Sequence, residues 1–326
     1  MEGDHGPAGG GDGDPGARRH AGEIDAAIQA LRDGRLAILP TETVYGLAAD
    51  AGNGGAVAAL FAAKGRPRFN PLIAHVADAG AARRIADLDP RALRLAEAFW
   101  PGPLTLVAQV RDEAAVCALA RAGLDTLAVR VPAHPLALAV LRAFGGPLVA
   151  PSANRSGRPS PTTLADAAAE VGEFAAAAID GGACAVGLES TVVSLLDGPA
   201  RLLRPGAVTR ASIEALIGPL AEAQDDARRS PGRMTRHYAP DAPVRLDAAA
   251  PLAGEAFLAF GDAPAGPGVF NLSPGRDLSE AAANLFAFLR AADALAPAAI
   301  AVAAIPAHGL GEAINDRLRR AAGKVG

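Results

Sequence analysis

The chain has 326 residues, of which half are hydrophobic and only 20% are charged, so it holds enough apolar material for a packed core in about two domains. Its formal net charge of −4 argues against a general nucleic-acid or membrane-surface binder, because such proteins usually carry a basic excess. The two cysteines, Cys117 and Cys184, are too few for a disulfide framework or a four-cysteine zinc site. The sequence contains no apolar run of membrane-spanning length and no apolar signal-peptide core, so we expect a cytoplasmic protein that does not contact a membrane.

The first 218 residues predict a disordered tail followed by one large α/β domain. Residues 1–20 are rich in glycine, proline and charge and have no apolar periodicity, which is typical of a disordered segment. Residues 21–218 then alternate short apolar runs with Ala-rich helical segments. The predicted strands are 36–39, 72–76, 105–110, 127–131, 147–150, 191–196 and 201–203. The predicted helices start with one that ends at Gly34 and continue with 55–63, 91–99, 135–143, 163–170 and one that Thr209 caps and that runs to Ile217.

A polar stretch and a second α/β unit follow. Residues 219–241 carry little apolar material and predict an interdomain linker, and residues 242–326 predict a smaller domain. Its predicted strands are 244–246, 257–260, 268–271 and 300–304, and its predicted helices are 279–294 and 310–322. The expected fold class is therefore α/β, with a large domain, a linker and a small domain.

Three polar clusters lie beside predicted strands, where ligands commonly bind in α/β folds. PTETVYGL (40–47) supplies hydroxyls for a small polar substrate, although a threonine-capped turn would look the same. KGRPRFNPL (64–72) holds three cations within five residues in a segment that two prolines make rigid, which suits a polyphosphate; the alternative is compensation of a helix dipole. APSANRSG (150–157) can surround phosphate or Mg²⁺, or can be an ordinary Ser/Asn loop.

Absent motifs and the positions of the few lysines and tyrosines limit the kinds of reaction that the chain can catalyse. The chain has no G-x-x-x-x-G-K-[ST] loop, no G-x-S-x-G, no H-E-x-x-H and no C-x-x-C motif, so no common nucleophile or phosphate loop is indicated. Only two residues are lysines, Lys64 and Lys324, so a lysine within the basic cluster stands out in a chain that otherwise uses arginine. Both tyrosines lie in notable segments: Tyr45 in the first cluster, and Tyr238 in the linker sequence RHYAP, where it is either functional or a hydrophobic anchor.

Taken in order, eight segments resemble the YrdC/YciO family, and most closely its two-domain threonylcarbamoyl-AMP synthases. The segments are PTETVYGL, KGRPRFNPL, FWPGPLTLV, TLAVRVPAHP, APSANRSG, ESTVV, LLRPGAV and SPGRMTRHYAP. The resemblance implies a YrdC-like twisted mixed-sheet domain with a cationic cavity, followed by a smaller Rossmann-like α/β domain. It also implies that L-threonine, bicarbonate or CO₂, and ATP with Mg²⁺ give L-threonylcarbamoyladenylate and pyrophosphate, and that the product goes to a tRNA threonylcarbamoyl-transferase complex.

The resemblance assigns roles to particular residues. Nucleotide phosphates and catalysis fall on Lys64, Arg66, Ser152 and Asn154. The other ATP contacts fall on Asn70, Thr126, Ser160, Arg204 and Tyr238. The threonine contacts fall on Thr43, His75, Arg130, Ser190 and the backbone of Ala150. No metal ligand is assigned, and the linker is expected to close over the active site.

The sequence departs from the family pattern at two positions, and two alternative functions remain open. The chain has Ser194 after STVV where relatives often have Asp, and its linker reads RMT where a lysine is common. A carbamoyl-adenylate-type carbamoyltransferase of the same fold would carry zinc-finger cysteines, which this chain lacks. A double-stranded RNA-binding module fits the negative net charge poorly, although a local cavity could still make an RNA contact.

Overall fold

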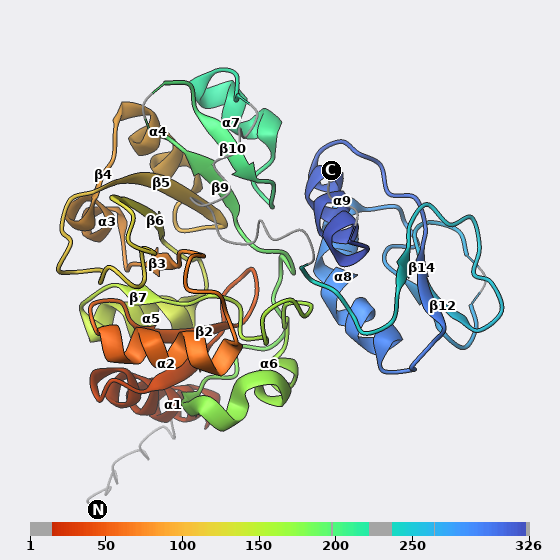
Figure 1. Ribbon diagram of the computed structural model, residues 1–326, viewed down its shortest axis with the longest axis horizontal. Coiled ribbons are helices and arrows are strands. Elements are labelled where there is room, and N and C mark those ends of the chain that lie inside the picture. The colour runs from red at the N-terminus through yellow and green to blue at the C-terminus, as the bar shows by residue number, and fades with distance from the viewer. Residues whose placement is uncertain (1–14, 197, 222–236, 264, 324–326) are drawn as a thin grey trace, which may run out of the picture.

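The computed structural model describes residues 15–196, 198–221, 237–263 and 265–323. Figure 1 shows two domains side by side, each built around its own sheet, with helices α8 (Leu278–Asp293) and α9 (Leu310–Ala321) of the second domain facing the first. This is the expected architecture, a large α/β domain followed by a smaller one. The predicted linker is described only at its ends, because residues 222–236 lie outside the described part of the chain.

The first domain contains a ten-stranded mixed sheet in the order β10-β9-β5-β6-β3-β7-β2-β1-β8, with β4 paired to β5. Its strands are β1 (Leu36–Leu39), β2 (Gly46–Asp50), β3 (Ile73–His75), β4 (Ala86–Asp87), β5 (Leu104–Val110), β6 (Thr126–Arg130), β7 (Leu148–Val149), β8 (Ala175–Ala178), β9 (Thr191–Ser194) and β10 (Arg201–Arg204). Its helices are α1 (Pro15–Arg32), α2 (Gly54–Lys64), α3 (Ala79–Ile85), α4 (Pro90–Phe99), α5 (Pro135–Phe144), α6 (Leu164–Val171) and α7 (Arg210–Ile217), with a 3₁₀ turn at Gly172–Phe174. Strand pairs β3/β6, β5/β9 and β1/β8 are parallel, and the other pairs are antiparallel.

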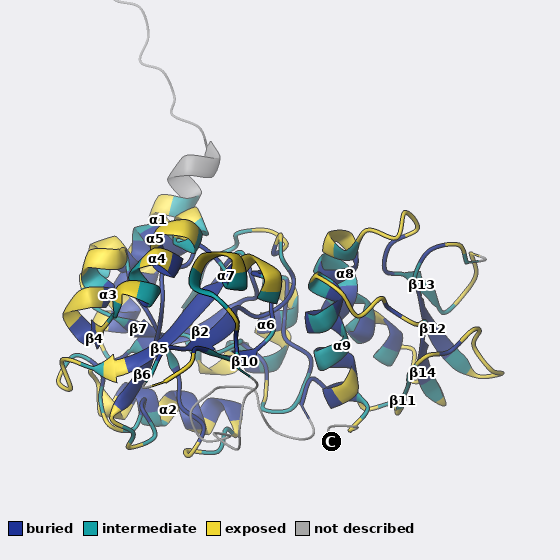
Figure 2. Cartoon of the chain, turned by 90° about the horizontal axis from the view of Figure 1, so that it is seen from above, coloured by how far each residue is buried: buried dark blue, intermediate teal, exposed yellow. Residues whose placement is uncertain are grey.

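The second domain contains an all-parallel sheet in the order β11-β14-β12-β13. Its elements are β11 (Val244–Arg245), β12 (Glu255–Ala259), β13 (Val269–Asn271), α8 (Leu278–Asp293), β14 (Ala299–Val302) and α9 (Leu310–Ala321). Both helices lie between this sheet and the first domain in the two views (Figures 1 and 2). The second domain therefore presents its helices to the first.

Most predicted elements are present, and the differences have local causes. Helix α1 begins at Pro15, so residues 15–20 are helical rather than part of the expected tail. The short elements β2, β4 and α3 were not expected, and neither was β8. Strand β8 consists of four alanines, which have low strand propensity, and it forms because it pairs with the buried strand β1.

The two domains share buried apolar surface. Leu188 and Val44 of the first domain belong to the same apolar cluster as Leu285 and Phe286 of α8. At Gly187, a Cβ atom would come within 2.5 Å of the Cα atom of Ala283, so the backbones approach closely enough to require glycine.

Within the described residues, no helix is both long enough and apolar enough to cross a membrane.

Candidate active site

A cavity lies in the first domain on the side that faces the second, since its lining residues Val44 and Glu189 contact the second domain. Its walls come from the loop before β2, the segment after α2, strands β3 and β6, the loop after β7, and the ends of β9 and β10. The described linker residues His237 and Tyr238 complete it. The lining residues are Thr43, Val44, Arg66, Leu72, Ile73, His75, Arg130, Ala150, Pro151, Ser152, Glu189, Ser190, Arg204, His237 and Tyr238.

Sheet register explains why four of the polar side chains meet. His75 and Arg130 end the parallel neighbours β3 and β6 and are paired in register. Ser190 immediately precedes β9, which runs parallel to β5, and Arg204 ends β10, which runs antiparallel to β9. Because β5 runs antiparallel to β6, these strand ends share one edge of the sheet. Residues far apart in sequence are thereby held on rigid elements.

Arg130 is buried and orients Thr43 through a charged network. Its Nη1 donates to the Thr43 hydroxyl at 3.0 Å, its Nη2 contacts Oε1 of Glu42 at 2.5 Å, and its Nε donates to the Gly102 carbonyl at 3.1 Å. Burial alone would raise the pKa of Glu42, but Arg130 and the Ala133 N–H outweigh it and lower that pKa. The pair therefore stays ionised and fixes the Thr43 side of the cavity.

His75 is a neutral side chain at this end of the cavity. Burial, with a smaller contribution from Arg130, lowers its pKa to about 3. Its Nδ1 lies 3.2 Å from the Ile73 carbonyl, which can only accept, so Nδ1 carries the proton. The other ring nitrogen, Nε2, is consequently an acceptor.

Two further lining residues, Arg66 and Arg204, form a cationic wall of the cavity. Gly65 adopts a left-handed conformation (φ 57°) after α2, and this ends the helix and directs the chain into Arg66. Arg66 donates to the carbonyls of Asn70 at 3.3 Å and Pro71 at 3.1 Å, and burial lowers its pKa only to about 10, so it stays charged. Arg204 donates to the backbone carbonyl and the hydroxyl of Ser190, at 3.0 and 3.1 Å. The wall is therefore suited to an anionic ligand.

Lys64 lies behind this wall. It is 3% exposed, and its Nζ donates to the carbonyls of Ser152, at 2.5 Å, and Asn154. Burial, together with the charge of Arg66, lowers its pKa to about 7. Lys64 thus holds the backbone of the Ser/Asn loop, with an ammonium whose charge is finely balanced at neutral pH.

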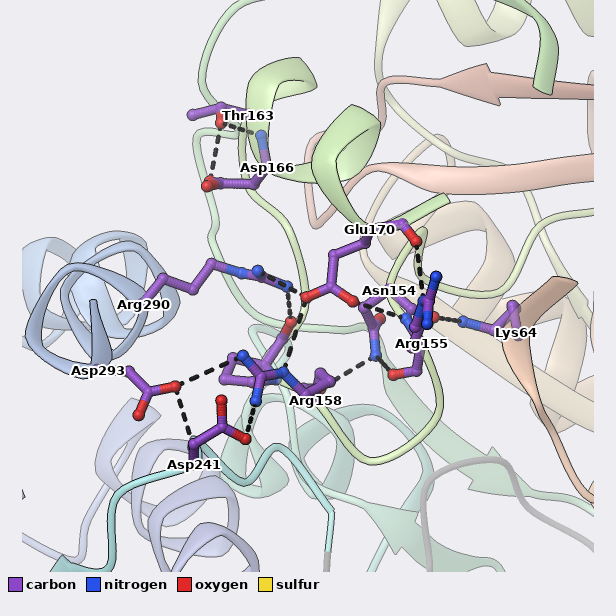
Figure 3. A network of polar contacts seen from close by, with 11 residues as sticks. Lys64, Asn154, Arg155, Arg158, Thr163, Asp166, Glu170, Asp241, Arg290 and Asp293 are labelled. Carbon is purple, nitrogen blue, oxygen red and sulfur yellow. Dashed lines mark hydrogen bonds and ion pairs between the residues drawn. The ribbon is translucent and has the colours of Figure 1, made fainter. Parts of the chain in front are cut away.

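A polar network leads from that loop to the second domain (Figure 3). The Asn154 amide donates to the Arg158 carbonyl at 3.0 Å, and the Arg158 guanidinium pairs with Asp241 and, at 3.5 Å, with Asp293 of α8. Glu170 of α6 accepts from Arg290 of α8 at 2.9 Å. The loop beside Lys64 is therefore tied to α8.

A second connection runs through Glu189, the carboxylate among the lining residues. Its Oε1 accepts from the Ser160 hydroxyl, and its Oε2 accepts from Nε of Arg317 in α9 at 2.9 Å. Burial would raise the pKa of Glu189, but Arg317, Arg204 and the Ser160 hydrogen bond lower it on balance. The guanidinium of Arg317 also lies 5.4 Å from the centroid of the Tyr238 ring.

Several buried polar atoms near the cavity have no partner within the described residues. They are Asn70 Oδ1, Asn154 Oδ1, His237 Nδ1, Tyr238 OH and, farther off, Arg290 Nε. Such atoms are rare in folded proteins, and their grouping around one cavity is typical of a ligand site. Tyr238 additionally has a positive φ of 60°, which is unusual for a residue other than glycine.

The structure brings most of the predicted site residues into one cavity. Those that line it are Thr43, Arg66, His75, Arg130, Ala150, Ser152, Ser190, Arg204 and Tyr238. Lys64, Asn70, Asn154 and Ser160 lie outside the lining, with Ser160 bonded to the lining residue Glu189. Thr126 does not line the cavity either, because it begins β6, whereas Arg130 ends that strand.

Four residues that complete the site were not assigned from sequence. Glu42 and Glu189 lie inside the matched segments PTETVYGL and ESTVV, and His237 precedes Tyr238, so position in a motif was their only signal. Arg317 carried a stronger one: with Ile314, Leu318 and Ala321 it falls at helical spacing on the apolar face of α9. An arginine on such a face indicates a buried charged partner.

Comparison with known proteins agrees with this geometry. The Sua5/YciO/YrdC family profile, described as telomere recombination, matches residues 29–206, and the profile of the threonylcarbamoyl-AMP synthase C-terminal domain matches residues 208–323. The threonylcarbamoyl-AMP synthase of Bacillus subtilis is 39% identical over 92% of this chain and 93% of its own length. The Pyrococcus abyssi enzyme of that name is 38% identical over 92% of this chain and 94% of its own length.

A solved structure covers both domains. The crystal structure of Pyrococcus abyssi Sua5 complexed with L-threonine superposes with a TM-score of 0.85 at 37% identity, over 92% of this chain and 94% of that one. A sheet domain with a cationic cavity joined to a small parallel-sheet domain thus defines a two-domain YrdC-type protein. The chain belongs to the threonylcarbamoyl-AMP synthase family in its Sua5 form, and its activity is that of a nucleotidyltransferase in tRNA modification. The carbamoyltransferase and RNA-binding alternatives do not account for the match to the family's C-terminal domain.

Proposed function

We propose that the cavity binds L-threonine at its Arg130 end and the phosphates of ATP at its Arg66 end. The observation that carries this proposal is that three arginines and two neutral histidines, His75 and His237, line one cavity. The threonine contacts are the predicted ones: Thr43, His75, Arg130, Ser190 and the backbone of Ala150. A carboxylate suits Arg130, and the neutral His75 ring offers an acceptor to a hydroxyl or ammonium group.

The nucleotide contacts follow from the opposite wall. Arg66, Ser152 and Arg204 line the phosphate region, and Tyr238 lies over it. Lys64 and Asn154 support the loop that carries Ser152, so we assign their contribution to that loop and to charge near the phosphates. Asn70 and Ser160 flank the region, whereas Thr126 is the weakest of the predicted ATP contacts, because it starts β6 away from the cavity.

The chemistry requires no nucleophile from the protein. The uncharged threonine amine adds to the carbon of CO₂, derived from bicarbonate, and loses a proton to water, which gives a carbamate. A carbamate oxygen then forms a bond to the α-phosphorus of ATP, the bond from that phosphorus to the β-phosphate oxygen breaks, and pyrophosphate leaves. Positioning of two anions and neutralisation of their charge supply the catalysis, and the arginines serve that purpose.

Magnesium belongs to this proposal as part of the ATP substrate. The described residues contain no group of three or more acidic, histidine or cysteine side chains that could hold a metal ion. The side-chain oxygens of Asn70 and Asn154, which have no partner in the part of the chain that the structure describes, are hard donors of the kind that Mg²⁺ accepts beside phosphates. Magnesium would neutralise phosphate charge, and Arg66 and Arg204 would hold the phosphates in place.

The described end of the linker covers the cavity in this proposal. Tyr238 is 1% exposed, and the Ala239 N–H donates to the Gly157 carbonyl at 2.7 Å, which pins the segment beside the Ser/Asn loop. A closed cover protects a carbamate and a mixed anhydride from water. The labile product must then pass to an enzyme that transfers the threonylcarbamoyl group to tRNA. A gel shift with and without ATP would detect direct binding of RNA to this chain.

The test is pyrophosphate release from ATP with L-threonine and bicarbonate supplied together or omitted in turn, with the adenylate identified by mass spectrometry. We expect release to require all three substrates. Arg66→Ala should raise the KM for ATP more than the KM for threonine, and Thr43→Val should do the reverse. Equal effects of both variants on both substrates would refute the assignment of the two ends.

A further inference from the structure

Arg317 of the second domain is a buried arginine whose guanidinium contacts the wall of the cavity. It has 0% exposed surface, although it belongs to α9, a helix outside the domain that forms the cavity. Its Nε meets Glu189 Oε2 at 2.9 Å, and its Nη1 donates to the Pro205 carbonyl at 2.8 Å and to Asp316 Oδ2 at 2.9 Å. Two of these three partners belong to the first domain.

Glu189 poses an electrostatic problem for a cavity that binds anions. Its carboxylate is buried and lines the same wall as Arg66 and Arg204. An uncompensated carboxylate there would repel a polyphosphate and attract those two arginines. Ser160 occupies one carboxylate oxygen of Glu189, and Arg317 occupies the other and supplies a full positive charge.

We propose that Arg317 is a positioning residue of the reaction: its guanidinium neutralises Glu189 so that the positive charge of Arg66 and Arg204 acts on the phosphates of ATP. The inference rests on the proposed placement of those phosphates. Arg317 also lies against the Tyr238 ring, so one side chain of the second domain fixes both the charge of the wall and the described end of the linker. The second domain thereby completes the active site.

The decisive experiment compares the single variant Arg317→Gln with the double variant Glu189→Gln/Arg317→Gln. Removing only Arg317 leaves a buried carboxylate beside the phosphates, so the KM for ATP should rise about tenfold or more, with a smaller change in the KM for threonine. Removing the Glu189 charge as well should restore most of the ATP affinity. If the double variant binds ATP no better than the single variant, the proposal is wrong.

Two further variants separate charge from general docking of the domains. Glu312→Gln removes an ion pair that the same helix makes with Arg210 of the first domain, at 3.0 Å, outside the cavity lining. It should leave the KM for ATP unchanged, and a rise equal to that of Arg317→Gln would show that docking alone matters. Arg317→Lys, which keeps the charge, should have a lower KM for ATP than Arg317→Gln even if both lose thermal stability; equal values would overturn the proposal.

Failure of this inference differs from failure of the proposed function. If Arg66→Ala raises the KM for ATP but Arg317→Gln does not, the phosphates lie where proposed and only the role of Arg317 is refuted. If Arg66→Ala itself leaves the KM for ATP unchanged, the placement of ATP is wrong and the inference falls with it.

Discussion

Lys64 should give ATP binding a pH dependence of predictable sign. Its ammonium is buried behind the wall that carries Arg66, where we propose that the phosphates bind, and burial lowers its pKa from 10.5 to about 7. Lys64 should therefore be about nine-tenths protonated at pH 6 and about one-tenth at pH 8. Arg66 stays charged over that range, and His75 and His237 stay neutral, because their pKa values are about 3.

A bound polyphosphate favours the charged form of Lys64, so ATP binding above pH 7 must take up a proton. The Kd for ATP should consequently rise with pH above 7, by up to about tenfold per pH unit, which is about 1.4 kcal/mol. The ligand-free protein should show the opposite trend. Its unfolded chain binds more protons than the folded chain between pH 7 and 10.5, so stability should rise across that window, by on the order of 5 kcal/mol for the full pKa difference.

Calorimetric titration with ATP at several pH values, in buffers of different ionisation enthalpy, measures the proton uptake directly. Lys64→Arg is the matched control, because its guanidinium stays charged over this range and any proton taken up by ATP itself is common to both proteins. Whatever its absolute affinity for ATP, the control should have a Kd that changes little between pH 7 and 9 beyond the change due to ATP. Equal proton uptake by the two proteins would refute this account of Lys64.

The other expectations concern the linker, the threonine pocket and the domain contact. Tyr238→Phe keeps the ring beside Arg317 but removes a buried hydroxyl that has no partner among the described residues, so it should keep the melting temperature and lower the yield of intact adenylate; an unchanged yield would contradict a role for the hydroxyl. Serine should replace threonine poorly but not negligibly, because a missing methyl group costs about 1–3 kcal/mol in kcat/KM, and equal kcat/KM values would exclude a methyl-sensing pocket. Gly187→Ala should lower the melting temperature markedly, since its Cβ would lie 2.5 Å from Ala283 Cα at a φ of 71°, and a neutral result would show that the interface can shift.

The sequence predicted the fold class because its strongest signals are local. Continuous apolar runs such as 36–39 and Ala-rich helices with clear caps report directly on burial and helix formation. Strand β8 could not be predicted in this way, because four alanines become a strand only by pairing with β1. The short strand β2 begins at Gly46, inside the PTETVYGL motif, and continues into two alanines, which have low strand propensity, so it forms mainly by pairing with β1.

The candidate site was predictable to the extent that the family motifs mark it. Those motifs identified Arg66, Arg130 and Arg204 as residues of one site, although only sheet register could show how they meet. They could not show that Lys64 holds two carbonyls behind the wall, because that depends on where the Ser/Asn loop lies. Nor could they identify Arg317, whose partner Glu189 is 128 positions away in the chain.

The contacts between the domains explain why docking and catalysis should be coupled. Ion pairs that water reaches contribute little to stability, and the partly exposed pair between Arg210 and Glu312 is one of them. Arg317 and Glu189 are different, because both are buried and the loss of one partner leaves an uncompensated charge. If the second domain left its docked position, Glu189 would lose its partner Arg317, and the Tyr238 ring would lose the same guanidinium. The carboxylate would then stand uncompensated in the wall where we propose that the phosphates bind. The docked arrangement is therefore the one in which the cavity is both closed and cationic, the two conditions that a water-labile, anionic intermediate requires.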